Sequence, residues 1–258
     1  MTTHELLLQL ALFSGALLAN LVSALAGGGA GLVQLPLLIL LGLPFPFALA
    51  THKLASVALG VGATLRHARE RRLNLRFALL ILISGLPGVW LGARLVLLLP
   101  AKLCTLLLGL LTIGLGIYSL GRPELGTRAQ LRSHGWAGLL LGGLVLFGIG
   151  MLNGSLTSGT GLFVTLWLVR WFGLDYGRAV AYTLILVGLF WNGTGAFTLG
   201  LQGQIAWRWI PALLLGSLLG GYLGAHLAIA RGNRLVKRCF EVLALLMGGS
   251  LLFKTFLG

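Results

Sequence analysis

The chain is a succession of apolar runs separated by short polar or glycine-containing breaks. Ten runs can be separated, and their lengths follow the same order twice: long, short, long, long and medium. The first half contains 5–26, 30–43, 46–65, 77–99 and 103–120, and the second half contains 135–152, 160–173, 179–198, 208–229 and 239–257. Runs of this length and apolarity are typical of membrane-spanning helices. The pattern therefore predicts an all-α polytopic membrane protein.

The second run of each half is too short to cross a bilayer as a regular helix. Each follows a break of small residues, AGGGAG at 26–31 and TSGTG at 157–161. The apolar stretch after each break has about 14 residues, or about 21 Å of helix against a hydrocarbon core of about 30 Å. Short, glycine-interrupted segments at matching places in two halves are the best sequence indicator of a transporter's binding site. We therefore expect the two breaks to meet near the bilayer midplane.

Residue matches between the halves indicate an internal duplication. Gly-x-x-x-Gly at 88–92 matches the same pattern at 220–224, and each is followed by alanine. This spacing lets two membrane helices approach closely. The expected organisation is a first repeat over 1–120, a cytoplasmic linker over 121–134 and a second repeat over 135–258.

Basic residues predict that the second repeat is inverted relative to the first. The loop after the third run is arginine-rich in the first half (66–76), whereas its counterpart (199–207) has no Lys or Arg. After the fourth run the first half has Lys102 alone and the second has four basic residues at 231–238. If every run crosses, most of the 19 Lys and Arg lie on one side, which the positive-inside rule makes the cytoplasm. Both termini are then outside.

A rival topology stays open. If the short runs dip into the membrane and return, each half crosses four times and the two halves are parallel. That topology puts the arginine-rich loop and its uncharged counterpart on the same side, so the charge distribution disfavours it.

The composition agrees with a membrane protein and argues against a soluble domain or a nucleic-acid-binding protein. Hydrophobic residues make up 57% of the chain and charged residues 9%, which no soluble domain of this size could bury. A net charge of +14 would indicate nucleic acid in a soluble protein, but here the basic residues lie in short loops, so the expected partner is the lipid bilayer. Cys104 and Cys239 match no metal-ligand spacing, and we expect no metal or other cofactor.

Lys53 is a cation within the third apolar run, in FALATHKLASVALG. Charge inside a membrane is expensive and usually functional, so Lys53 is a candidate for binding an anion, with Thr51 and His52 as further donors. The alternative is that its long stem reaches the outer interface. Adjacent helix residues point about 100° apart, so His52 and Lys53 need not face one cavity.

The glycine breaks are the second candidate. A helix that begins after a break offers N–H groups and a positive dipole end to an anion, and 157–160 adds hydroxyl donors. The alternative is close helix packing at small residues. Polar residues in the runs, among them Asn153, Thr183 and Asn192, either touch substrate or bond a neighbouring helix. The candidate substrate-binding residues are Gly27, Gly28, Gly29, Gly31, Gln34, Thr51, His52, Lys53, Thr157, Ser158, Gly159, Thr160 and Asn192.

Acidic residues offer little for other chemistry. The chain has five, and only Glu241 falls within a run, where we expect it to pair with nearby Arg238. No paired carboxylates, HExxH motif or Ser-His-Asp set is evident, so neither a carboxylate proton relay nor an enzyme is expected.

The stretch 26–56 resembles the TauE/SafE family of sulfite and organosulfonate exporters. The resemblance rests on AGGGAG, PLLILLGLP at 36–44 and ALATHK at 48–53, and the second copy at 153–200 supports it. It implies a permease for small anions in the bacterial inner membrane, and Lys53 falls on the family's lysine. The chain departs from the family at His52, where asparagine is expected, which leaves the substrate open.

The working hypothesis is export of sulfite or organosulfonates by alternating access. No coupling ion is obligatory for outward anion flux, while proton coupling through His52 stays possible. The alternatives are a cation or other small-solute permease of the same fold, and a non-transporting membrane scaffold. The oligomeric state is open.

Overall fold

The computed structural model describes residues 3–67, 73–95, 101–132, 135–156, 159–202 and 204–257. Within these residues every regular element is a helix, so the all-α prediction is confirmed. In the described part of the chain, six helical stretches are long and apolar enough to cross a membrane. The protein is therefore a multi-pass membrane protein by its helices as well as by its composition.

Each half has the predicted short second helix, but the last helix of the second half has 25 residues, so the prediction of a medium last run was wrong there. The first half contains α1 (Thr3–Ala26), α2 (Ala30–Leu40), α3 (Phe45–His67), α4 (Leu75–Leu95) and α5 (Ala101–Leu120). The second half contains α6 (Trp136–Ser155), α7 (Thr160–Arg170), α8 (Tyr176–Tyr182), η3 (Thr183–Trp191), α9 (Asn192–Gly200), η4 (Trp207–Trp209), α10 (Ile210–Arg231) and α11 (Asn233–Leu257). The three pieces α8, η3 and α9 follow one another without a gap and together correspond to the third run of this half.

The predicted ends of the two short runs were wrong, and so was one predicted loop. The short helices α2 and α7 have 11 residues each, or about 16 Å, because the chain leaves the helix before Gly42 and Gly173, which have positive φ. The basic stretch at 231–238 is not a loop. Only Gly232, with φ 77°, separates α10 from α11, and the basic residues after it have good helix propensity.

The third segment of the second half differs from that of the first. Helix α3 is a regular α-helix, whereas η3 is a nine-residue π-helix. Both segments are mostly buried, unlike the outer helices α1 and α6. They cross where Gly60 of α3 meets Gly188 of η3, since a Cβ on Gly60 would lie 2.7 Å from the Gly188 carbonyl carbon. These two segments therefore form the centre of the molecule.

The two halves interleave through their glycine motifs. Helix α1 packs along α10 and α6 packs along α4, so the first helix of each half pairs with the fourth helix of the other half. Gly88 and Gly92 lie on the α6 backbone, and Gly220 and Gly224 lie on the α1 backbone. The predicted close approach at both motifs is confirmed.

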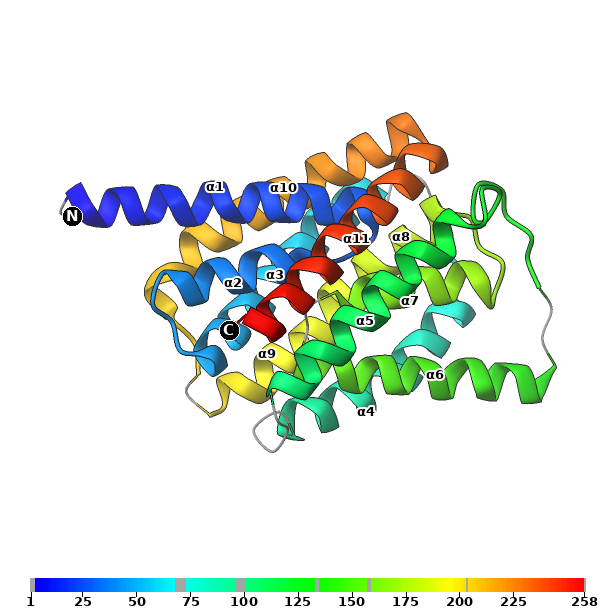
Figure 1. Ribbon diagram of the computed structural model, residues 1–258, viewed down its shortest axis with the longest axis horizontal. Coiled ribbons are helices and arrows are strands. Elements are labelled where there is room, and N and C mark those ends of the chain that lie inside the picture. Colours follow the sequence, from blue (N-terminus) through cyan, green and yellow to red (C-terminus); the bar gives the residue numbers. More distant parts are fainter. Residues whose placement is uncertain are drawn as a thin grey trace.

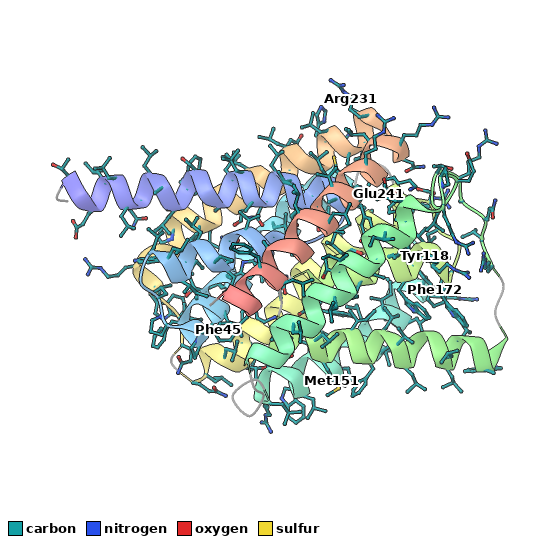
Figure 2. All side chains as sticks on the ribbon, viewed as in Figure 1. Phe45, Tyr118, Met151, Phe172, Arg231 and Glu241 are labelled. Carbon is teal, nitrogen blue, oxygen red and sulfur yellow. The ribbon has the colours of Figure 1, made fainter. Side chains whose placement is uncertain are left out.

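The two ends of the molecule are distinct. Both chain ends lie in the left half of Figure 1, whereas the linker between α5 and α6 lies at the right. Figure 2 places Phe45, which begins α3 after α2, toward the left, and Phe172, just after α7, toward the right. The two short helices thus lead to opposite ends, as an inverted repeat requires. The inversion itself, and the side of the membrane that each end faces, stay predictions.

Candidate functional site

The two glycine breaks are in direct contact. A Cβ on Gly28 would lie 2.6 Å from the carbonyl carbon of Gly161 and 2.8 Å from the nitrogen of Leu162. The chain reaches this contact through three consecutive glycines with φ values of 83°, 136° and 98° at positions 27–29, a conformation that side chains disfavour. The carbonyl of Gly27 accepts a hydrogen bond from Thr165 Oγ1 at 2.7 Å. Backbone from both halves therefore builds one junction.

Two helices begin at this junction. Gly29 precedes α2 and Gly159 precedes α7, both in the left-handed conformation, and as glycines they have no side chain that could cap the helix. The first turn of a helix carries N–H groups without intrahelical acceptors, and its dipole is positive at that end. Figure 1 shows α2 to the left and α7 to the right of the centre. Their positive ends thus converge on the junction from opposite sides.

A small cavity of about 40 Å³ lies against the junction. Its walls come from α1, both breaks, α3, α6, η3 and the start of α9. This volume holds a few water-sized groups, which is the scale of a small ion. Among the described residues that line it, none is a carboxylate, a cysteine or a methionine.

Two buried polar atoms on the cavity wall have no hydrogen-bond partner among the described residues. These are the hydroxyl oxygen of Ser23 and the amide oxygen of Asn192. Unsatisfied buried polar groups are costly and need an explanation. The Ser23 hydroxyl can donate to a bound anion, whereas the Asn192 oxygen requires a donor such as a water.

Lys53 reaches the cavity wall through Asn153. Its side chain is 0% exposed, and its Nζ donates to the Asn153 carbonyl at 2.6 Å and to Asn153 Oδ1 at 3.3 Å. Asn153 Nδ2 in turn donates to Thr160 Oγ1 at 2.9 Å, at the first residue of α7. Gly195 leaves room for the lysine stem, because a Cβ there would lie 2.7 Å from Lys53 Cδ. The amino group of Lys53, in the first half, is thus connected to the helix start of the second.

His52 belongs to a second polar chain. Its Nδ1 lies 3.0 Å from Gln34 Oε1 and its Nε2 lies 3.3 Å from Ser56 Oγ. The Gln34 amide oxygen accepts only, so His52 Nδ1 donates to it, and the Ser56 hydroxyl can either donate to Nε2 or accept from it. Gln34 Oε1 also accepts from Asn20 Nδ2 at 3.3 Å. Helices α1, α2 and α3 are joined beside the cavity by this chain.

The structure brings most of the predicted residues together. The cavity is lined by six of them: Gly28, Gly29, Gly31, His52, Thr160 and Asn192. Four more lie next to lining residues: Gly27 and Gly159 are their neighbours in the chain, Gln34 contacts His52, and Lys53 contacts Asn153. Thr51 lies elsewhere, because its hydroxyl accepts from the nitrogen of Ala206 at 3.0 Å. Thr157 and Ser158 lie outside the described residues.

Two cavity residues were missed, and one predicted ion pair was wrong. Ser23 and Ser56 line the cavity and were not identified from the sequence, although each is an isolated hydroxyl within an apolar run. The prediction that Glu241 pairs with Arg238 was wrong: its partner is Lys237, one turn earlier on α11, and Ser119 of α5 also donates to it. Residues three and four apart on a helix can both pair, and Lys237 is held beside Glu241 because its Nζ also donates to the Ser119 carbonyl at 2.8 Å.

Comparison with known proteins places the chain in a family. The family model described as sulfite exporter TauE/SafE matches residues 12–251. A probable membrane transporter protein of Haemophilus influenzae is 31% identical over 94% of this chain and 93% of its own length. The probable membrane transporter protein YfcA of Escherichia coli is 30% identical over 94% of this chain and 88% of its own. No solved structure matches the chain.

The fold and the buried polar cavity define a multi-pass membrane transporter. Because the family model covers nearly the whole chain, the protein belongs to the TauE/SafE family.

Proposed function

We propose that this protein carries small anions, sulfite or organosulfonates, out of the bacterial cell by alternating access. The observation that carries the proposal is the convergence of two helix N-termini, each preceded by glycine, on a cavity whose described lining contains no carboxylate. Helix N-termini are ready-made anion sites. The name of the matching family points to the same class of substrate.

In this proposal the two halves hold the anion jointly. First-turn N–H groups of α2 and α7 and the hydroxyls of Ser23 and Thr160 surround it. Lys53 supplies a positive charge that acts through Asn153 rather than by direct contact. The substrate site then lies at the repeat interface, where inverted-repeat transporters bind their substrates.

The membrane potential supplies the driving force in this proposal. An inside-negative potential favours outward movement of an anion by about 2.3 kcal/mol per charge per 100 mV. In this proposal the arginine-rich end is in the cytoplasm and both termini are outside. Because the potential alone drives the anion outward, an exporter of this kind needs no coupling ion. The inner membrane of a bacterium is the corresponding location.

The test is flux of sulfite and of small alkanesulfonates into and out of proteoliposomes at a set membrane potential. Wild type should show saturable flux that responds to the potential. Lys53→Met keeps the length of the stem and removes the charge, and the loss of a charge-assisted interaction should lower flux by about tenfold to a hundredfold. Absence of flux with any sulfur anion, in protein shown to be folded, would exclude this substrate class.

A matched control lies two positions earlier on the same helix. The Thr51 hydroxyl bonds to Ala206 rather than to the cavity, so Thr51→Val should keep substrate affinity close to wild type. Equal loss of affinity in both variants would mean that the Lys53 substitution disturbs α3 as a whole. Normal transport by Lys53→Met would remove Lys53 from the site.

A further inference from the structure

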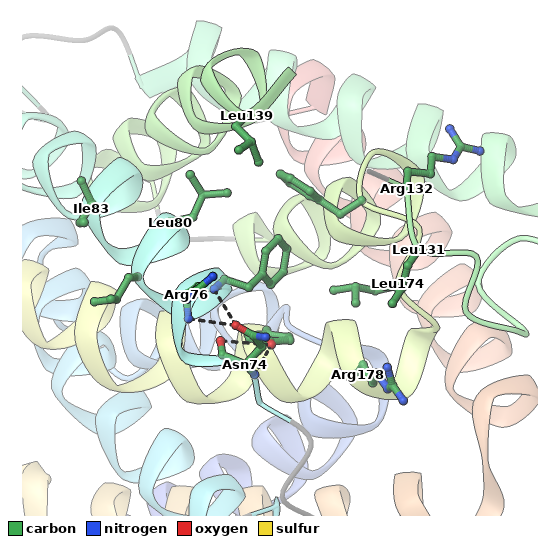
Figure 3. Close-up of a pocket in the computed structure, with 13 residues that line it drawn as sticks. Asn74, Arg76, Leu80, Ile83, Leu131, Arg132, Leu139, Leu174 and Arg178 are labelled. Atoms are coloured by element: carbon green, nitrogen blue, oxygen red, sulfur yellow. Dashed lines mark hydrogen bonds between the residues drawn. The ribbon is translucent and has the colours of Figure 1, made fainter. Parts of the chain in front are cut away.

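A second and larger hollow of about 700 Å³ lies at the arginine-rich end of the molecule. It is formed by the first turns of α4, the start of α6, the turn between α7 and α8, and the end of the linker (Figure 3). None of its lining residues is shared with the central cavity. It is therefore a separate site, and the anion proposal leaves it without a role.

One wall of this groove is apolar and lies on the outer surface of the protein. Leu79 and Ile83 of α4 are exposed one turn apart, Leu139 of α6 is opposite, and Leu131 of the linker is also exposed. Exposed apolar side chains on a membrane-spanning helix contact lipid chains. The dimensions and chemistry of this wall suit an acyl chain lying along α4.

Basic side chains lie on two sides of the groove. Arg76, Arg132 and Arg178 line it. Arg178 forms an ion pair with Asp175 at 3.4 Å, whereas no described carboxylate pairs with Arg76 or Arg132. The lining therefore keeps a net positive charge after its described ion pair is counted.

The segments that carry these arginines are held in place by the fold. The linker pairs with the α7–α8 turn, since Gln130 N donates to the Gly173 carbonyl at 2.8 Å and Arg132 N donates to the Phe172 carbonyl at 3.2 Å. On the other side, the Asn74 side chain caps α4 by accepting from Arg76 N at 2.9 Å. Figure 3 shows Arg76 and Asn74 together on one side of the groove and Arg132 on the other.

The groove lies at the level of the membrane where lipid headgroups are found. Trp136 is the first residue of α6, one turn before the lining residue Leu139, and is 83% exposed. Exposed tryptophans at helix ends concentrate at the level of the membrane–water interface. An apolar wall on the bilayer side and arginines at the interface match a phospholipid with an anionic headgroup.

We propose that this groove binds an anionic phospholipid of the leaflet at the arginine-rich end. The phosphate lies among Arg76, Arg132 and Arg178, and one acyl chain lies against Leu79, Leu80 and Ile83. The bound lipid joins the linker to α4 and α6, so it ties the two halves of the chain together at this end. The inference depends on membrane insertion alone and not on which solute is transported.

The test is native mass spectrometry of the full-length protein with phosphatidylglycerol and, separately, with phosphatidylcholine of the same chains. Wild type should retain phosphatidylglycerol preferentially. The double variant Arg76→Ala/Arg132→Ala should bind it roughly thirty-fold more weakly, the factor that two arginines near an anionic surface represent. The matched control is Arg231→Ala/Arg234→Ala, which removes the same charge from a different hollow at α10 and α11 and should bind as wild type does.

A third variant tests the apolar wall without touching the arginines. Leu80→Trp narrows the groove and should also weaken phosphatidylglycerol binding, whereas binding by headgroup charge alone would be unaffected. Equal loss in both double variants would show unspecific attraction and overturn the proposal. Equal retention of phosphatidylcholine, or displacement by soluble glycerol 3-phosphate, would likewise overturn it in favour of an unselective surface or a free-anion site.

Discussion

At the residue scale, Gly28 combines two requirements that no other amino acid meets. Its φ is 136°, and the backbone of Gly161 occupies the space that a Cβ would need. The same contact brings the starts of α2 and α7 together. A single missing side chain therefore fixes the distance between the two helix ends that we propose bind the anion.

We predict that Gly28→Ala lowers both stability and transport. Backbone strain at positive φ costs about 1–3 kcal/mol, and the steric clash adds to it, so the free energy of unfolding should fall by about 2–4 kcal/mol. Thermal unfolding in detergent and sulfite flux measure the two effects. The control is Gly114→Ala in α5, where a Cβ would meet nothing within 4 Å; it should be neutral or stabilise by up to about 1 kcal/mol. A Gly28→Ala protein as stable as that control would contradict the backbone contact.

At this scale the sequence indicates which types of residue form the site better than it indicates which residues contact one another. A lysine in an apolar run is visible as an anomaly because charge in a membrane is costly. That Lys53 meets Asn153, 100 positions later, is not visible, because the partner lies in another run with no local signal. Ser23 and Ser56 were missed for a related reason: a single hydroxyl in a helix has a low cost and commonly bonds to its own backbone.

At the scale of elements, the glycine motifs determine which helices pack together. Gly220 and Gly224 of α10 lie on the backbone of α1, and Gly88 and Gly92 of α4 lie on that of α6. Close backbone approach replaces the hydrophobic effect, which does not drive helix association within lipid. The motif was readable in the sequence, but its partner helix was not.

We predict that Gly220→Val separates α1 from α10. A Cβ at this position would lie 3.0 Å from the backbone nitrogen of Leu21 and 3.1 Å from Asn20 Cβ, and overpacking of this kind costs about 1–3 kcal/mol. The melting temperature in detergent should fall accordingly. Gly148→Val on α6 is the comparison, since a Cβ there meets nothing within 4 Å and the change should be within about 0.5 kcal/mol. Similar melting temperatures for the two variants would refute the packing argument.

The π-helix η3 is the element that the sequence did not predict. TLILVGLFW is apolar throughout and reads as an ordinary helix segment. A π-helix changes the hydrogen-bond register of the backbone rather than its apolar content, and such segments are frequent at functional sites. Here Thr183 and Val187 of η3 line the central cavity, so the unusual register occurs beside the proposed substrate.

At the scale of the whole molecule, the open question is how often each half crosses the membrane. The short helices lead to opposite ends of the molecule (Figure 2), which supports five crossings per half. With five crossings the linker lies on the opposite side from both termini. With four it lies on the same side as the termini.

We predict that alkaline phosphatase fused after Gly258 is active and that the same enzyme inserted after Arg128 is inactive, because the enzyme folds only outside the cytoplasm. Green fluorescent protein at the same two positions should give the opposite result. Phosphatase activity at both positions would support the parallel, four-crossing arrangement instead.

By itself the sequence determined the class of protein, the order of the helices, the two breaks and the embedded lysine. These features depend on local quantities: the length of apolar runs, the absence of a Cβ and the cost of a buried charge. The tertiary structure decided which breaks, helices and polar groups meet, including Gly28 with Gly161 and Lys53 with Asn153. It also decided that Thr51 lies away from the cavity. Such pairings depend on the packing of distant segments, and no local pattern in the chain specifies the partner.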